Sequence, residues 1–149
     1  ASRDRGVQVV VVERTGRYSR SDRLLLSRDF QRVSRQASRF ASRDFVVLVA
    51  PARNPALHAS ADDALAPVRR LGITASRKVG NAIVRNRVKR GIREWFRHRR
   101  QHLAPDTDTV VIARAGAGEL GVPDIAAALD EIVARAAKQA ARRSHERRA

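Results

Sequence analysis

The spacing of hydrophobic residues changes along the chain and predicts interleaved helices and strands. From Asp22, apolar residues recur every three to five positions, which predicts a short first helix or two linked turns; they are Leu24, Leu25, Phe30 and Val33. Residues 40–50 contain a continuous apolar run closed by Pro51, as expected of a strand covered on both faces. Residues 68–75 and 109–113 predict a second and a third strand, the last entered through a loop that holds Asp106 and Asp108.

Two longer helices are predicted in the second half of the chain. Over about residues 81–101 one buried stripe repeats at the i, i+4, i+8 and i+11 spacing of a helix, formed by Val84, Val88, Ile92 and Trp95. We expect Gly80 or Asn81 to cap this helix and Phe96 to lie at the margin of the core. A last helix opens at Pro123 and Asp124, and its charged end, residues 142–149, is expected to fray.

These elements predict a single α+β domain. A chain of 149 residues can bury one modest core, and we expect a two-layer α/β sandwich in which helices pack on a small, mostly antiparallel sheet of three or four strands. Residues 1–21 are interpreted as a basic N-terminal extension, disordered or forming one strand. Residues 22–140 form the domain and 141–149 a basic C-terminal tail. The proline-containing segment 51–67 is interpreted as an exposed connection.

The charge balance points to a polyanionic partner. The chain has 31 Lys and Arg against 15 Asp and Glu, a net charge of +16 that opposes compaction unless a polyanion neutralises it. It has no cysteine, which favours the cytoplasm and excludes disulfides and thiolate metal sites. The apolar run at residues 7–12 is too short to span a membrane, so no membrane partner is expected.

The positive charge is concentrated on the predicted helix at residues 81–101 and on the turn before it. Between residues 77 and 100 there are ten Lys or Arg side chains and one acid, Glu94. A helical projection places Asn86, Lys89, Arg90, Arg93 and Arg97 opposite the buried stripe, with Arg85 and Arg87 on the two shoulders. A face needed only for solubility would pair acids with bases, whereas this one places like charges together, at a cost that contacts with phosphates would relieve. The pattern therefore indicates a nucleic-acid-binding face.

Residues 72–97 closely resemble the signature block of the bacterial ribonuclease P protein family. The matching features are the stretch Ser76-Arg77-Lys78-Val79-Gly80-Asn81, then Arg85-Asn86-Arg87 followed by Lys89-Arg90, then Ile92-Arg93-Glu94. The segments on both sides of this block also resemble the family, so that the resemblance spans about residues 23–137. The resemblance implies a ribosomal-protein-like RNA-binding fold with helices on one face of the sheet and a left-handed βαβ crossover. It also implies an RNA-binding subunit that assists a catalytic RNA in removing 5′ leaders from precursor tRNA, with magnesium held mainly by the RNA.

Two RNA surfaces follow from this resemblance. The catalytic RNA would contact Arg77, Lys78, Asn81, Arg85, Asn86, Arg87, Lys89, Arg90, Arg93 and Arg97. The single-stranded leader would lie in a cleft between the first helix and the sheet, against Phe30 and Arg32. The chain departs from the family pattern at Ser34 and Leu48, where aromatic residues are common, which weakens the prediction of leader stacking.

Several other chemistries are less consistent with the sequence. His98 and His102 have metal-ligand spacing, but no third ligand is near, so we interpret them as exposed. The acid pairs Asp62–Asp63 and Asp106–Asp108 fall in predicted loops, so we assign no catalytic residues to the protein. A structural ribosomal or other RNA-binding protein and a metal-dependent nuclease remain alternatives. A DNA-binding regulator is disfavoured because the basic helix has few base-reading side chains beyond Asn86.

Overall fold

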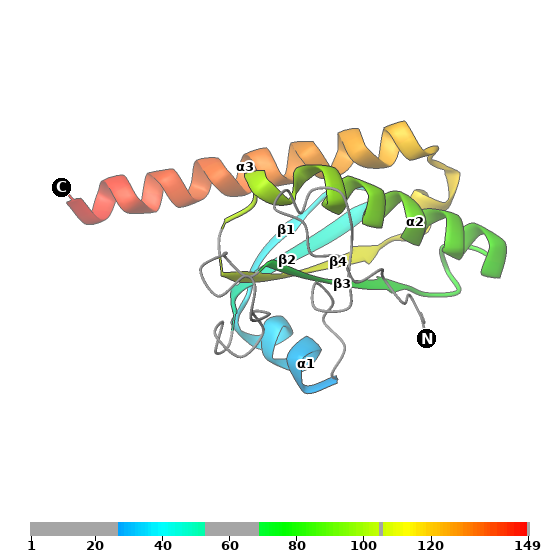
Figure 1. The fold of residues 1–149 in the computed structure, drawn as a ribbon, viewed down its shortest axis with the longest axis horizontal. Coiled ribbons are helices and arrows are strands. Elements are labelled where there is room, and N and C mark those ends of the chain that lie inside the picture. The colour runs from blue at the N-terminus through cyan, green and yellow to red at the C-terminus, as the bar shows by residue number, and fades with distance from the viewer. Residues whose placement is uncertain (1–26, 53–68, 105, 149) are drawn as a thin grey trace, which may run out of the picture.

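The computed structural model describes residues 27–52, 69–104 and 106–148, which form one α+β domain (Figure 1). The elements in chain order are α1 (Ser27–Gln36), β1 (Ser38–Ala41), β2 (Phe45–Pro51), β3 (Arg69–Ala75), α2 (Ala82–Arg99), the 3-10 helix η5 (Arg100–His102), β4 (Thr107–Ala113), the 3-10 helix η6 (Ala115–Glu119) and α3 (Val122–Arg148). The predicted N-terminal extension and most of the predicted connection at residues 51–67 lie outside the described residues.

The four strands form one mixed sheet in the order β1-β2-β4-β3. β1 with β2 and β2 with β4 are antiparallel, whereas β3 and β4 are parallel. Helix α2 connects the two parallel strands, so β3, α2 and β4 form the expected βαβ unit. The mostly antiparallel sheet is confirmed, and the left-handed sense of the crossover stays a prediction.

The apolar stretch predicted as one strand at residues 40–50 is instead a hairpin. Phe40 and Ala41 end β1, and the chain reverses before Phe45 begins β2. The Ser42 hydroxyl accepts hydrogen bonds from the backbone N–H groups of Asp44, at 3.3 Å, and Phe45, at 3.2 Å. A serine that bonds the backbone two and three residues ahead stabilises a turn, which explains why the prediction of a single strand was wrong.

Helices cover both faces of the sheet, so the expectation that all of them lie on one face is wrong. α2 and α3 pack on one face and form the predicted two-layer sandwich with the sheet (Figure 1). The shorter α1 packs on the opposite face, where Val33 meets Val46, Leu48 and Val110 in a second apolar cluster. Strand alternation produces both clusters, because Phe45 and Val47 face α2 and α3 while Val46 and Leu48 face α1.

The predicted stripe of α2 is the face that packs on the sheet and on α3. Val88 and Ile92 are completely buried and Trp95 is 3% exposed. Phe96, expected at the margin, is also completely buried, because it lies one residue beyond Trp95 on the side facing the sheet. The Trp95 indole N–H donates to Asp130 Oδ1 on α3 at 2.9 Å, which satisfies the polar group of this buried ring.

Helix α3 is longer than the sequence pattern predicted. The stretch from residue 142, expected to fray, continues the helix to Arg148, and the C-terminal half projects past the sheet (Figure 1). Alanine and arginine are among the strongest helix formers and dominate this stretch, which explains why it stays helical without packing. Ile125, Leu129 and Ile132 in the first half of α3 are completely buried against α2 and the sheet.

Candidate RNA interface

The turn from β3 into α2 fixes where the basic helix starts. Asn81 is the N-cap: its side-chain Oδ1 accepts from the backbone N–H of Val84 at 3.0 Å. Gly80 before it has a φ of 154°, a backbone conformation that residues other than glycine rarely adopt. Arg77 and Lys78 sit in this turn with exposed side chains. The predicted residues Arg77, Lys78 and Asn81 are therefore brought next to the first turn of α2.

The exposed face of α2 carries most of the predicted RNA-binding residues. Asn86, Arg87 and Arg90 are exposed, whereas Arg85, Lys89, Arg93 and Arg97 are half-buried. Arg87, predicted to lie at a shoulder of this face, is thus one of its exposed residues, whereas Lys89 and Arg93, predicted to lie opposite the buried stripe, are half-buried. We call this surface, together with the preceding turn, the α2 basic face; it consists of Arg77, Lys78, Arg85, Asn86, Arg87, Lys89, Arg90 and Arg93.

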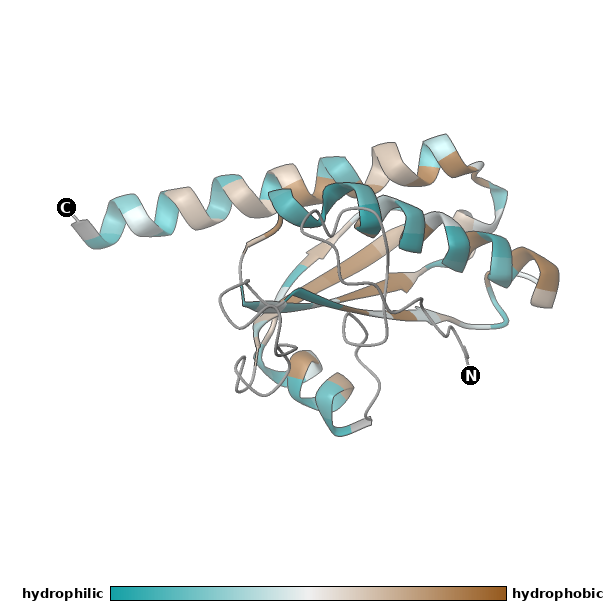
Figure 2. Ribbon diagram, viewed as in Figure 1, coloured by the Kyte–Doolittle hydropathy of each residue, from teal (hydrophilic) through white to brown (hydrophobic). Residues whose placement is uncertain are grey.

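An exposed apolar side chain lies within this face and was missed by the sequence reasoning. Ile83 is 79% exposed, and it stands three, four and seven residues before Asn86, Arg87 and Arg90 on the same side of the helix. Figure 2 shows the first turn of α2 as hydrophobic and the following turns as mostly hydrophilic. The sequence signal for this exposure is that Ile83 lies outside the buried stripe, on the polar side of the helical projection.

The charges of the α2 basic face are not balanced within the helix. Residues 82–93 contain no acid, and Arg85, Lys89, Arg93 and Arg97 follow one another at i, i+4 spacing. Like charges at this spacing destabilise an isolated helix by about 0.2–0.5 kcal/mol per pair. Glu94 is the first acid along α2, and Arg97 Nη2 lies 2.7 Å from its Oε2. The stretch of the helix without an acid therefore ends at Arg93.

Arg87 also has a structural contact with the loop before α3. Its Nη2 donates a hydrogen bond to the carbonyl oxygen of Gly118 in η6. A Cβ atom added at Gly118 would lie 2.1 Å from the Val79 carbonyl oxygen, so η6 packs directly against the turn that precedes α2. Gly118 thus allows η6 to pack against the start of the basic helix.

The two residues predicted to bind a leader lie on α1, on the opposite face of the sheet. Phe30 is half-buried at the margin of the α1 cluster. Arg32 is 13% exposed and is held by protein groups: its Nη1 donates to the Pro51 carbonyl at 2.9 Å and its Nη2 donates to Asp108 Oδ2. Arg32 is therefore a residue that fixes α1 on the sheet, whereas Phe30 is only partly buried.

The partner of Arg32 was missed by the sequence reasoning, which placed Asp108 in a loop. Asp108 lies in β4, is completely buried and also binds Arg70 of β3. Asp29 of α1 completes the group, with its Oδ2 3.8 Å from Arg70 Nη1. We call Asp29, Arg32, Arg70 and Asp108 the buried ion cluster. Its members are separated by up to 79 positions in the sequence, so no local pattern could reveal it.

The histidines and carboxylates do not form a metal site in the described part of the chain. His98 and His102 are exposed, and His98 Nδ1 lies 2.9 Å from the Glu94 carbonyl oxygen. Among residues 27–52, 69–104 and 106–148, no three His, Cys, Asp or Glu side chains gather closely enough to hold an ion. None of the helices in these ranges is long and apolar enough to span a membrane.

Sequence comparison identifies the family. A sequence model named Ribonuclease P matches residues 18–137, which include α1, the sheet and the whole α2 basic face. The chain belongs to the ribonuclease P protein family. The ribonuclease P protein component of Shouchella clausii is 35% identical over 117 residues, covering 78% of this chain and 87% of that protein. The component of Syntrophobacter fumaroxidans is 38% identical over 112 residues, covering 74% and 84%.

Solved structures of ribonuclease P proteins have the same fold. The Staphylococcus aureus protein matches with a TM-score of 0.63 and 32% identity, covering 77% of this chain and 94% of that one. The Thermotoga maritima protein matches with a TM-score of 0.61 and 28% identity, covering 76% and 96%. The chain is therefore a protein subunit of ribonuclease P, an RNA-based endoribonuclease of tRNA processing, and has an RNA partner. A structural ribosomal protein is not favoured.

Proposed function

We propose that the α2 basic face binds the catalytic RNA of ribonuclease P and that the α1 side of the sheet binds the leader of precursor tRNA. The observation that supports this most strongly is the unbalanced charge of α2: no acid occurs over residues 82–93, and Arg87 and Arg90 are exposed at its centre. Phosphate contacts would relieve the repulsion between these cations and release counterions. Ile83, exposed in the same face, would contact ribose or base carbon atoms at the RNA surface.

The two proposed surfaces lie on opposite layers of the domain, which suits a protein placed between two RNAs. α2 belongs to the layer above the sheet and α1 to the layer below it (Figure 1). Substrate and catalyst are both polyanions, so bringing them together costs Coulomb energy, and a protein of charge +16 between them lowers that cost. The magnesium ions required for hydrolysis would be held mainly by the RNA, and the complex would act in the cytoplasm.

The first experiment asks whether the protein acts through the RNA. Precursor tRNA is incubated with magnesium and the catalytic RNA, the protein, or both. We expect cleavage at the 5′ leader junction to be most efficient with both and absent with the protein alone. Cleavage by the protein alone would instead support a self-sufficient nuclease, and an equal rate with and without the protein would overturn the proposed function.

The second experiment tests the α2 basic face with a double variant. Lys89→Gln combined with Arg90→Gln removes two charges from the α2 basic face, and it spares Arg87, which donates to the Gly118 carbonyl. Each lost phosphate contact reduces the slope of log affinity against log salt by about 0.7–0.9. We therefore expect a slope reduced by about 1.5 for binding to the catalytic RNA.

A matched control removes the same charge from a different layer. Arg28→Gln combined with Arg35→Gln changes two exposed arginines of α1. This variant should retain the salt slope of the unmodified protein for the catalytic RNA. An equal loss in both double variants would mean that only total charge matters, and would contradict an RNA site on α2.

A further inference from the structure

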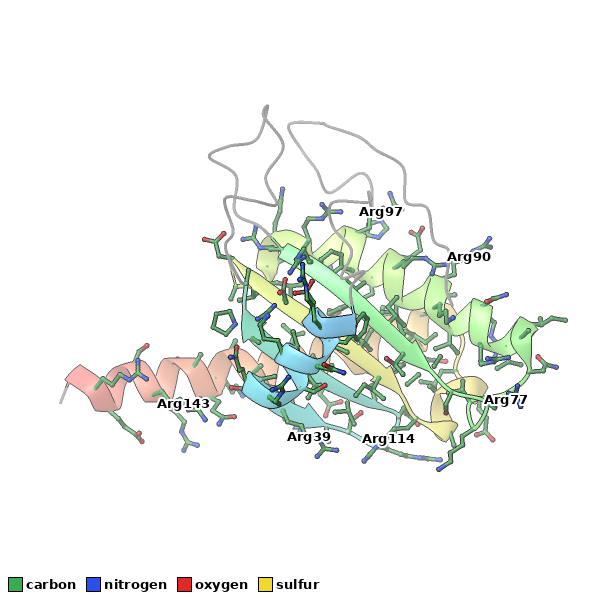
Figure 3. All side chains as sticks on the ribbon, turned by 90° about the horizontal axis from the view of Figure 1, so that it is seen from below. Arg39, Arg77, Arg90, Arg97, Arg114 and Arg143 are labelled. Carbon is green, nitrogen blue, oxygen red and sulfur yellow. The ribbon has the colours of Figure 1, made fainter. Side chains whose placement is uncertain are left out.

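A second row of basic side chains follows the edge of the sheet formed by β1. Seen from below, Arg39, Arg114 and Arg143 lie along one border of the molecule, whereas Arg90 and Arg97 of α2 lie along the opposite border (Figure 3). We call the row the β1-edge band and define it by six residues from β1, the end of β4 and α3: Arg39, Arg114, Arg135, Lys138, Arg142 and Arg143.

Contacts with β1 bring several members of the β1-edge band together. Arg114 Nη1 donates to the Ser42 carbonyl and Arg135 Nη2 donates to the Ala41 carbonyl, each at 2.7 Å. These carbonyls belong to consecutive residues, so both arginines bind the chain where the edge strand ends. At the start of the strand, Arg143 and Ser38 line the same apolar hollow of about 200 Å³ between α3 and the sheet.

The projecting half of α3 supplies the rest of the band. Arg135, Lys138 and Arg142 stand at i, i+3 and i+7, so they share one side of the helix. All band residues on α3 are exposed. Between Glu131 and Glu146 the helix contains no acid, so the cations are not balanced along its length. The nearby Asp44 is 19% exposed and has Arg43 Nε 4.0 Å from its Oδ1.

We propose that the β1-edge band binds the sugar-phosphate backbone of the precursor-tRNA substrate. The inference rests on the proposed function, in which the α2 basic face is covered by the catalytic RNA. The labelled band residues lie at the opposite border from Arg90 and Arg97 of α2, whereas Arg77 lies at the end of the molecule near Arg114 (Figure 3). A backbone that leaves the α1 side across the edge strand β1 would meet the band on β1 and α3, whereas an RNA bound at Arg90 and Arg97 would lie at the other border.

The contribution of α3 goes beyond what the family model describes. That model ends at residue 137, so Lys138, Arg142 and Arg143 lie outside the matched region. Residues 141–147 of the projecting helix are exposed, so its cations are accessible to another molecule. Charge complementarity with phosphate is the property that its exposed side offers.

The test uses the assembled ribonucleoprotein and a triple variant, Lys138→Gln, Arg142→Gln and Arg143→Gln. Glutamine keeps helix propensity while removing charge. Protein is held at saturation over the catalytic RNA, and the affinity for precursor tRNA is measured over a salt series. Each contact contributes about 0.7–0.9 to the salt slope, so the triple variant should reduce the slope for the substrate by about 2 and leave the affinity of the protein for the catalytic RNA unchanged.

Two further variants make the result specific. Removing three charges from the α2 basic face, with Arg77→Gln, Lys89→Gln and Arg90→Gln, should produce the reverse pattern: weaker binding to the catalytic RNA and an unchanged substrate slope once saturation is reached. Arg142→Lys with Arg143→Lys preserves charge and should retain the substrate slope of the unmodified protein.

The possible outcomes separate the two proposals. If the unmodified protein improves cleavage but the α3 triple variant binds substrate with an unchanged slope, the β1-edge inference is wrong and the proposed function stands. Weakened binding of that variant to the catalytic RNA instead of the substrate would also overturn the inference, by assigning the band to the other RNA. Failure of the unmodified protein to assist cleavage would overturn the proposed function itself.

Discussion

Asp108 and Arg70 face each other across the parallel strands β4 and β3 as a buried, doubly hydrogen-bonded pair. Arg70 Nε donates to Asp108 Oδ1 and Arg70 Nη2 donates to Asp108 Oδ2, each at 2.8 Å. The two residues are register partners, with 0% of Asp108 and 5% of Arg70 exposed. Since Arg32 of α1 binds the same carboxylate, this pair connects the helix that carries Phe30 to the centre of the sheet.

Replacing Asp108 with asparagine should destabilise the fold strongly. Asp108→Asn keeps the shape of the side chain but leaves the Arg70 guanidinium buried without its main counter-ion. Breaking a buried ion pair in this way costs about 3–5 kcal/mol, and the nearby Asp29 places the expected loss near the lower value, about 3 kcal/mol. Urea unfolding followed by the fluorescence of Trp95, which is the single tryptophan, measures it.

The matched control for this change is Glu119→Gln, the same replacement of carboxylate by amide at an exposed position in η6. It should alter the free energy of unfolding by less than about 0.5 kcal/mol. Similar losses at both positions would show that total charge, rather than the buried ion cluster, determines the stability.

Asn81 is expected to act on RNA binding indirectly, by starting α2 at the correct residue. Its Oδ1 is already used by the Val84 backbone N–H. Asn81→Ala should lower the free energy of unfolding by about 1 kcal/mol, whereas Asn81→Ser, which can also cap a helix, should change it by a few tenths. Affinity for the catalytic RNA should be retained in the serine variant. A loss of affinity in Asn81→Ser without a loss of stability would show a direct contact between the amide and RNA.

Gly118 is expected to tolerate no side chain, because backbone atoms occupy the space where its Cβ would lie. The closest is the Val79 carbonyl oxygen, 2.1 Å from the Cβ position. Gly118→Ala should therefore displace η6 from the turn before α2, with a cost of about 1–3 kcal/mol and weaker RNA binding by α2. At Gly116 the nearest atom is Oδ1 of the Asp44 side chain, which can rotate away. Gly116→Ala should accordingly cost less in the same urea unfolding measurement, and the opposite order would contradict this packing.

Local periodicity predicted the elements that bury one continuous stripe. The α2 helix was expected over about residues 81–101 and runs from Ala82 to Arg99, because Val88, Ile92 and Trp95 repeat on one face. The hairpin of β1 and β2 was missed, since an apolar run does not show where the chain reverses, although Ser42 and Asp44 supplied a turn signal. Apolar spacing also gave no reason to extend α3 to Arg148, because the end of that helix buries nothing.

In the candidate site, residues that are neighbours in the sequence could also be predicted, whereas contacts between distant residues could not. The basic residues of α2 could be predicted because a helix places neighbours at i, i+3 and i+4 on one side. The buried ion cluster could not be predicted, because Arg32 and Asp108 are 76 positions apart and meet only when α1 docks on the sheet. The family resemblance assigned Arg32 to the leader, and in the structure its guanidinium group binds Asp108 and the Pro51 carbonyl.

Phe30 is the α1 residue proposed to contact a leader, and it offers a direct test of that surface. Phe30→Leu keeps an apolar side chain at the margin of the α1 cluster but removes the ring. Stacking of a base on an aromatic ring is worth about 1–3 kcal/mol, so affinity for precursor tRNA should fall by about tenfold. Mature tRNA, which has no leader, should bind equally well to both proteins, and this comparison serves as the control.

Binding measurements with leaders of increasing length identify the nucleotide that contacts Phe30, since the loss of affinity should begin at the leader length that reaches the ring. Equal affinity of both proteins for every leader length would exclude stacking on Phe30, and would leave the leader to the basic side chains alone.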